Sequence, residues 1–206
     1  MCIRDSINGK DIASLALVTR EPQALGPHDV RVRINAVSLN FRDLMVARGD
    51  YLQGASSPVI PASDAAGEVI EVGKAVTRFA PGDRVMGSFF PDWIDGDATP
   101  ATTRVAPGAA TDGVLSTERV FAETALAATP PSLSDEQAST LPCAAVTAWN
   151  ALFVAGGAKA GHTALFLGTG GVSVWGLQLA KAAGLRAIIT SCLLYTSDAA
   201  DDSLRV

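Results

Sequence analysis

The feature that most constrains the fold of this 206-residue sequence is the segment TALFLGTGGVSVWGLQLAKAAGLRAIIT, residues 163–190. It contains an apolar run over 163–168, a glycine-rich turn, apolar residues at helical spacing over 171–183, and a second apolar run over 186–190. Short all-apolar runs on either side of a helix are typical of parallel strands buried on both faces. The segment therefore predicts a β-α-β unit.

The turn of this unit predicts a dinucleotide site. Gly168, Gly170 and Ser173 stand at the positions of a G-x-G-x-x-G fingerprint between a strand and a helix. The first glycine permits the tight turn, the second lets the backbone approach a pyrophosphate, and a small third residue permits close helix–strand packing. The helix start offers free N–H groups to phosphates. We expect the cofactor to contact Gly168, Gly170, Gly171, Val172 and Ser173, the alternative being an ordinary glycine-rich turn.

Earlier residues carry β signals. DVRVRINAVSL (29–39) alternates apolar and polar residues, AGEVIEVG (66–73) and RFAPGDRVMGSF (78–89) are bounded by turn residues, and 113–130 hold further strand-length segments. Many short strands with Gly and Pro turns favour a compact β-barrel. After residue 133 the pattern becomes helical, with capping-box spacing at Ser134 and Gln137 and a second helix over 143–155.

The two ends of the chain are predicted to be foreign to the natural protein. Codons that can encode residues 1–5 have a reverse complement that, read one base out of frame, encodes CLLYT, residues 192–196. Both ends resemble translations of a sequencing adapter, so we exclude 1–6 and 192–206 from the fold. The predicted domains are then 7–133 and 134–191, the second being cut after its second strand. We expect the 206-residue chain itself to be inactive.

Charge and composition exclude several classes of partner. The net charge is −5 and no basic cluster is present, which argues against nucleic-acid binding. No apolar run reaches the ~20 residues that span a bilayer, and the N-terminus lacks a signal-peptide core. We expect a cytoplasmic protein with no membrane partner.

Four stretches together resemble the medium-chain dehydrogenase/reductase superfamily, and most closely its zinc-independent, quinone-oxidoreductase-like branch. They are VRINAVSLNFRDLMVARGDY, PVIPASDAAGEVIEVGKAVTRFAPGDRV, LPCAAVTAWNAL and LGTGGVSVWGLQLAKAAG. The resemblance implies a mixed α/β fold, in which a GroES-like β-barrel precedes a Rossmann domain that is truncated here. It also implies NAD(P)(H)-dependent hydride transfer to or from a small carbonyl, quinone or enone, and a parent protein that is a homodimer.

Zinc ligands are not found where the resemblance would place them. Zinc alcohol dehydrogenases carry Cys, His-Glu and Cys at the stretches that here contain Asn40, Ser63-Asp64 and Cys143. Catalytic zinc requires three Cys, His or carboxylate ligands plus water, so we expect no metal. Cys143 is expected to be a buried packing residue, and Trp149 and Trp175 are expected to lie in the core.

Without a Lewis acid, positioning and hydrogen bonding must assist the hydride transfer. The resemblance suggests Asn40 as a substrate-side donor, Arg42 and Asp43 as residues shaping the cleft, Ser63 beside them, and Thr147 against the nicotinamide. Asn40 and Asp43 alternatively cap a turn.

The residue that selects the cofactor is expected ~20 or slightly more positions after the first glycine of the loop. Counted from Gly168, this interval falls on Thr190, Ser191 and Cys192, and Cys192 belongs to the predicted foreign end, so we expect the stretch that selects the cofactor to be replaced there. Thr190 and Ser191 include no acid, which tilts weakly to NADP over NAD without excluding NAD. The alternative to an enzyme is a non-enzymatic NAD(P)-binding or structural relative of the same fold.

Overall fold

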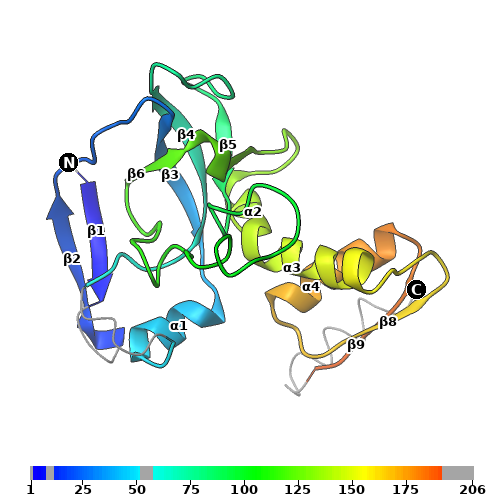
Figure 1. The fold of residues 1–206 in the computed structure, drawn as a ribbon. Coiled ribbons are helices and arrows are strands. Elements are labelled where there is room, and N and C mark those ends of the chain that lie inside the picture. The colour runs from blue at the N-terminus through cyan, green and yellow to red at the C-terminus, as the bar shows by residue number, and fades with distance from the viewer. Residues whose placement is uncertain (1, 8–11, 52–57, 192–206) are drawn as a thin grey trace. The chain divides into compact units, whose positions relative to one another are not determined.

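The computed structural model describes residues 2–7, 12–51 and 58–191 (Figure 1). The chain forms two compact units, Met1–Cys143 and Ala144–Val206, which are described separately. The units divide later along the chain than the 133/134 boundary suggested by the sequence.

The first unit contains two antiparallel sheets. In the smaller sheet β1 (Cys2–Ile7) pairs with β2 (Leu15–Arg20). The larger sheet has the order β6-β3-β4-β5-β7. Its strands are β3 (Asp29–Ser38), β4 (Asp64–Val72), β5 (Arg84–Gly87), β6 (Glu118–Ala122) and β7 (Leu126–Ala128). Helices α1 (Phe41–Arg48) and α2 (Asp135–Ala138) and the 3-10 turns Ile12–Ser14 and Glu123–Ala125 complete the described elements.

The alternation of buried apolar and more exposed polar side chains predicted in β3 is confirmed. Val30 and Val32 are buried, whereas Arg33 is exposed. A core of small apolar side chains fills the inner side of the larger sheet. Its buried members are Val30, Val32, Ala62, Ala65, Val69, Val85, Val114, Phe121 and Leu126. The segment 78–89, predicted to be a strand entered through a Pro-Gly-Asp turn, contains that turn, with Gly82 in a left-handed conformation (φ 95°), and the strand that follows it occupies Arg84–Gly87.

The capping box predicted at Ser134 is confirmed. The Gln137 N–H donates to Ser134 Oγ at 3.3 Å, and the Ser134 N–H donates to Gln137 Oε1 at 3.0 Å. Asp135, in the first turn of α2, accepts hydrogen bonds from Arg84 on β5 and from Asn35 on β3. One carboxylate thus joins α2 to two strands of the sheet.

A helical segment from Leu141 to Ala155 follows. It consists of π-helical turns at Leu141–Ala145, α3 (Val146–Trp149) and further π-helical turns at Asn150–Ala155. The predicted helix over 143–155 is therefore present, but most of it is wider than an α-helix. Trp149, expected in the core, is 53 % exposed, and its ring packs against that of Phe153 with centroids 4.7 Å apart and planes inclined by 58°.

The second unit contains the predicted β-α-β unit. β8 (Thr163–Phe166) and β9 (Arg186–Ile189) pair in parallel, and α4 (Gly171–Ala182) connects them. Ala164 and Phe166 are half-buried on one face of β8, whereas Thr163 and Leu165 are exposed on the other. Burial on both faces, expected from the all-apolar runs, is not seen in this two-stranded sheet.

Candidate active site and cofactor-binding loop

Asn40 is the N-terminal cap of α1. Its backbone is extended (φ −113°, ψ 155°), and its N–H donates to Asp43 Oδ2 at 2.8 Å. Asp43 is buried, and its other oxygen, Oδ1, accepts no hydrogen bond. The Asn40 Nδ2 atom is also buried and lies outside ordinary hydrogen-bond geometry with every acceptor in the described part of the chain. The capping alternative for these two residues is therefore realised, and one polar atom of each makes no hydrogen bond to the described residues.

Ser63 and Asp64 lie at the start of β4. Both are fully buried, and Ser63 Oγ donates to Asp64 Oδ1 at 2.6 Å. The second carboxylate oxygen, Asp64 Oδ2, accepts the Cys143 N–H at 2.9 Å. The sequence suggested Ser63 as a site residue and assigned no role to Asp64. The structure places Asp64 at the centre of this cluster and uses the Ser63 hydroxyl to hold it.

The residue before this pair has a strained backbone. Ala62 has a φ of 65°, in the left-handed region that non-glycine residues rarely occupy. Glycines at 108 and 113 pack against this bend, where a Cβ atom would lie 2.5 Å and 2.1 Å from the Ala62 carbonyl oxygen. Such strain persists only where surrounding structure enforces it, and here the loop 107–113 does so.

Burial raises the pKa of Asp64 above its ordinary value, and the neighbouring Asp43 carboxylate raises it further. The Ser63 hydroxyl, the nearby Asn40 amide and the Cys143 N–H act in the opposite direction. The carboxyl is thus poorly solvated as an anion and depends on these hydrogen-bond donors.

Arg42 forms a cation–aromatic cluster beside this site. Its guanidinium carbon lies 4.7 Å from the centre of the Phe89 ring and 5.7 Å from that of Tyr51. Nη2 donates to the Pro107 carbonyl at 2.5 Å and lies 3.7 Å from Asp43 Oδ1. Nε and Nη1 are buried and have no hydrogen-bond acceptor among the residues that the structure describes. Arg42 therefore connects α1 to loops 89–94 and 107–113 and retains unused donors.

The glycine loop has the geometry that a tight strand-to-helix turn requires. Gly168 has a φ of 78°, and Gly170 is the N-terminal cap of α4. A Cβ atom at either position would meet no atom within 4 Å, so the surface over both residues is open. Because neither glycine has a side chain, a ligand can approach the backbone of the loop from solvent.

The close helix–strand packing expected of the third fingerprint residue is provided elsewhere. Ser173 donates from Oγ to the Leu167 carbonyl at 3.1 Å, which fixes the loop. At Gly176 a Cβ atom would lie 2.4 Å from the Phe166 ring of β8. Gly176, which the sequence analysis did not single out, is the residue that lets α4 approach the sheet.

The end of β9 contacts the same loop. The Gly168 N–H donates to Thr190 Oγ1 at 3.1 Å, and the Thr190 N–H donates to the Phe166 carbonyl at 3.0 Å. The structure therefore brings Thr190 to the glycine loop, with Ser191 next in the chain. Thr147 is exposed on α3.

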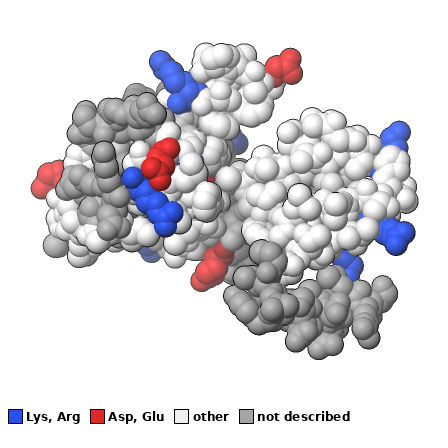
Figure 2. All heavy atoms as spheres, turned by 90° about the horizontal axis from the view of Figure 1, so that it is seen from below, with Lys and Arg blue, Asp and Glu red and all other residues white. Residues whose placement is uncertain are grey.

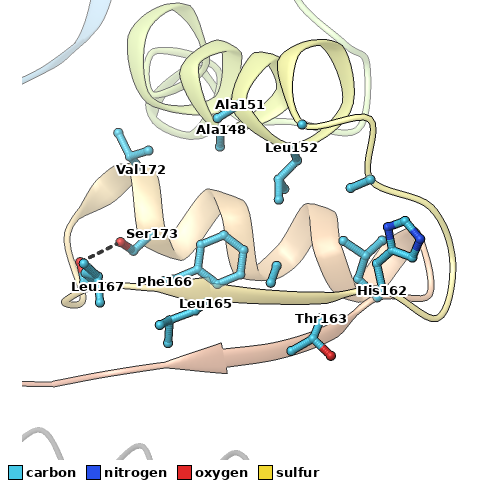
Figure 3. Close-up of a pocket in the computed structure, with 14 residues that line it drawn as sticks. Ala148, Ala151, Leu152, His162, Thr163, Leu165, Phe166, Leu167, Val172 and Ser173 are labelled. Atoms are coloured by element: carbon cyan, nitrogen blue, oxygen red, sulfur yellow. Dashed lines mark hydrogen bonds between the residues drawn. The ribbon is translucent and has the colours of Figure 1, made fainter.

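A pocket of about 420 Å³ adjoins the loop within the second unit (Figure 3). Ala148, Ala151 and Leu152 face it from the helical segment, and Phe166 faces it from β8. Val172 and Ser173 line it near the start of α4, so two of the predicted cofactor residues border an apolar hollow.

The donor set fits a metal ion poorly. Within residues 2–7, 12–51 and 58–191 no three His, Cys, Asp or Glu side chains come close enough together to hold one. Both Asp64 oxygens already accept hydrogen bonds, and the neighbouring Asn40 and Ser63 are weak zinc ligands.

On the face shown in Figure 2, charged side chains are scattered among uncharged ones. No described helix is long and apolar enough to cross a membrane.

Comparison with known proteins identifies the family. Residues 26–131 match the alcohol dehydrogenase GroES-like domain. The chain is 45 % identical over 172 residues to a zinc-type alcohol dehydrogenase-like protein of Schizosaccharomyces pombe, covering 82 % of the chain and 50 % of that protein. It is 32 % identical over 167 residues to acryloyl-coenzyme A reductase of Metallosphaera sedula, covering 78 % and 50 %.

A solved structure agrees. A proposed alcohol dehydrogenase from Sinorhizobium meliloti 1021 superposes with a TM-score of 0.87 at 44 % identity, covering 98 % of this chain and 60 % of that one. The fold and the glycine loop place the chain among the alcohol dehydrogenase-like proteins. The chain belongs to the medium-chain dehydrogenase/reductase family, as the resemblance predicted. It spans about half the length of these two curated relatives.

Proposed function

We propose that the chain is part of a zinc-independent NAD(P)H-dependent reductase that acts on conjugated carbonyl compounds. The observation that carries this proposal is the open glycine loop at the start of α4. Gly168 and Gly170 leave their backbone unobstructed, and the N–H groups of the first helical turn carry a positive partial charge suited to a pyrophosphate.

The bound nicotinamide would supply a hydride, and the protein's residues would orient the acceptor and stabilise the charge that develops on it. Asn40 is proposed as a hydrogen-bond donor to the substrate carbonyl, since its Nδ2 makes no hydrogen bond to any described residue. Arg42 and Asp43 would shape the substrate side, and Ser63 would act through Asp64. Thr147 would contact the nicotinamide. The similarity to acryloyl-coenzyme A reductase supports enones and enoyl thioesters as acceptors, with quinones as a related class.

Zinc independence is proposed from the donor set. A relative bears the name zinc-type alcohol dehydrogenase-like protein, yet the described residues of this chain assemble no three-ligand group. Further parts of the proposal are a preference for NADP over NAD, from the absence of an acid at Thr190-Ser191, a cytoplasmic location and a homodimeric parent. The 206-residue chain alone is proposed to be inactive, and measurable NAD(P)H oxidation by it would contradict this.

The test uses one substitution that the fold tolerates and a dinucleotide would not. Gly170 has a φ of −74° and open space at its Cβ position, so Gly170→Val should leave the melting temperature unchanged. In the protein encoded by the complete source gene it should weaken NADPH binding at least about tenfold, through steric loss of pyrophosphate contacts. Gln178→Val is the control, because Gln178 is exposed on the same helix and lies outside the loop.

Isothermal titration with NADPH and NADH measures both affinities. Equal NADPH affinity in the Gly170 variant and wild type would reject the loop as the site. Failure of the wild-type protein to bind either nucleotide would favour the non-enzymatic relative.

A further inference from the structure

Three segments that are far apart in the sequence meet at one buried carboxyl group. Asp64 accepts from Ser63 beside it and from the N–H of Cys143, 79 residues later, and the Asn40 amide lies near it. Asn40 begins α1, Asp64 begins β4, and Cys143 lies in the first turns of the 141–155 segment. These are also the stretches in which the resemblance placed the zinc ligands of other family members.

A carboxyl group at this position is energetically unfavourable in its ionised form. Asp64 is fully buried, and among the described residues no Lys, Arg or His lies within ion-pair distance of it. An asparagine could accept the Cys143 N–H and donate to Ser63 without a buried charge. Ionisable groups retained where they reduce stability are candidates for a functional role.

We propose that Asp64 is a positioning residue that gathers the three segments where other family members use a metal ion. Its carboxylate holds the start of the 141–155 segment at the beginning of β4, and this junction lies beside the Asn40 amide and sets where that amide presents a donor to the substrate carbonyl. This role rests on the proposed reductase function. It involves no contact between Asp64 and the substrate, because Asp64 is fully buried behind these residues.

The kinetic test uses Asp64→Asn in the protein encoded by the complete source gene. We expect kcat for an enone substrate to fall about 10- to 100-fold, as for other residues that orient a ligand-contacting group. KM for NADPH should stay within twofold and the melting temperature should not fall. Asp83→Asn is the matched control, since Asp83 also accepts a backbone N–H, from Ala80 at 2.8 Å, but lies outside the site. An unchanged kcat in Asp64→Asn would overturn the proposal.

Two further measurements separate this proposal from the reductase function. Hydrogen exchange at the Cys143 amide should accelerate at least about tenfold in Asp64→Ala, because its acceptor is lost, and stay unchanged in Asp83→Asn. Unchanged exchange would overturn the positioning role even if no enzymatic activity is found. Elemental analysis should find no zinc in the wild-type protein; one zinc per chain, lost in Asp64→Asn, would show that a metal organises the site. Absence of any carbonyl reduction by the wild type would reject the proposed function.

Discussion

Gly176→Ala provides a sharp test of how α4 reaches the sheet. The added Cβ would lie 2.4 Å from Cε1 and 2.9 Å from Cδ1 of Phe166, closer than carbon atoms can approach. Glycine-to-alanine changes inside helices ordinarily stabilise by about 1 kcal/mol. Here the ring or the helix must move, and overpacking typically costs about 1–3 kcal/mol. If the overpacking cost lies in the upper part of this range, about 2–3 kcal/mol, subtracting the helical gain of about 1 kcal/mol leaves a net destabilisation of about 1–2 kcal/mol.

Hydrogen exchange of the α4 and β8 amides is the assay, since it reports on the second unit by itself. A loss of about 1–2 kcal/mol should accelerate exchange about 5- to 30-fold. Gly171→Ala in the same helix is the control, because its Cβ meets only Ala144 at 3.6 Å, an ordinary contact. If Gly176→Ala exchanges as slowly as the wild type, Phe166 moves aside at no cost and the packing argument is wrong.

Three further predictions concern the first unit and metal dependence. Ala62→Gly should raise the free energy of unfolding by about 0.5–1 kcal/mol, because it relieves the strain of a left-handed alanine (~1–2 kcal/mol) at some cost in chain entropy. Ala65→Gly in β4 is the control and should lower the free energy of unfolding, and urea denaturation compares the two variants. The Thr77 N–H, with further donors, lowers the pKa of Glu123 below its ordinary value. The stability that this carboxylate contributes to the fold is therefore present above the unfolded-state pKa and is lost as the pH falls through the folded-state pKa. Glu123→Gln should therefore flatten the acid limb of a melting-temperature profile, and a limb as steep as the wild type's would count against this carboxylate. Dialysis against a strong chelator should leave the melting temperature unchanged; a decrease that Zn²⁺ restores would contradict zinc independence.

Local signals predicted the secondary structure well. The strand–turn–helix–strand pattern of residues 163–190 produced the observed β8, α4 and β9, because hydrophobic spacing and glycine placement act over a few residues. The capping box at Ser134 is likewise local. The extent of burial was less accessible to the sequence, as exposed Trp149 illustrates, because it depends on which elements are present to cover a residue.

The arrangement of the site required tertiary information. Asp64 had no assigned role because its partner Cys143 lies far along the chain and its burial arises from the folded sheet. The close-packing role was expected at Ser173 and is filled by Gly176, since only the helix–strand register decides which residue faces Phe166. The strained φ of Ala62 has no signal in the sequence, because alanine ordinarily avoids that conformation.

The bare face of the β8–β9 pair has a practical consequence for handling the protein. Leu165 is 60 % exposed and Ile188 43 % exposed on that face, and within the described residues this sheet has two strands and therefore two open edges. Apolar faces and unpaired strand edges promote self-association as concentration rises. We expect the chain's colloidal stability to fail before its fold does, so that light scattering increases with concentration at temperatures where circular dichroism remains constant.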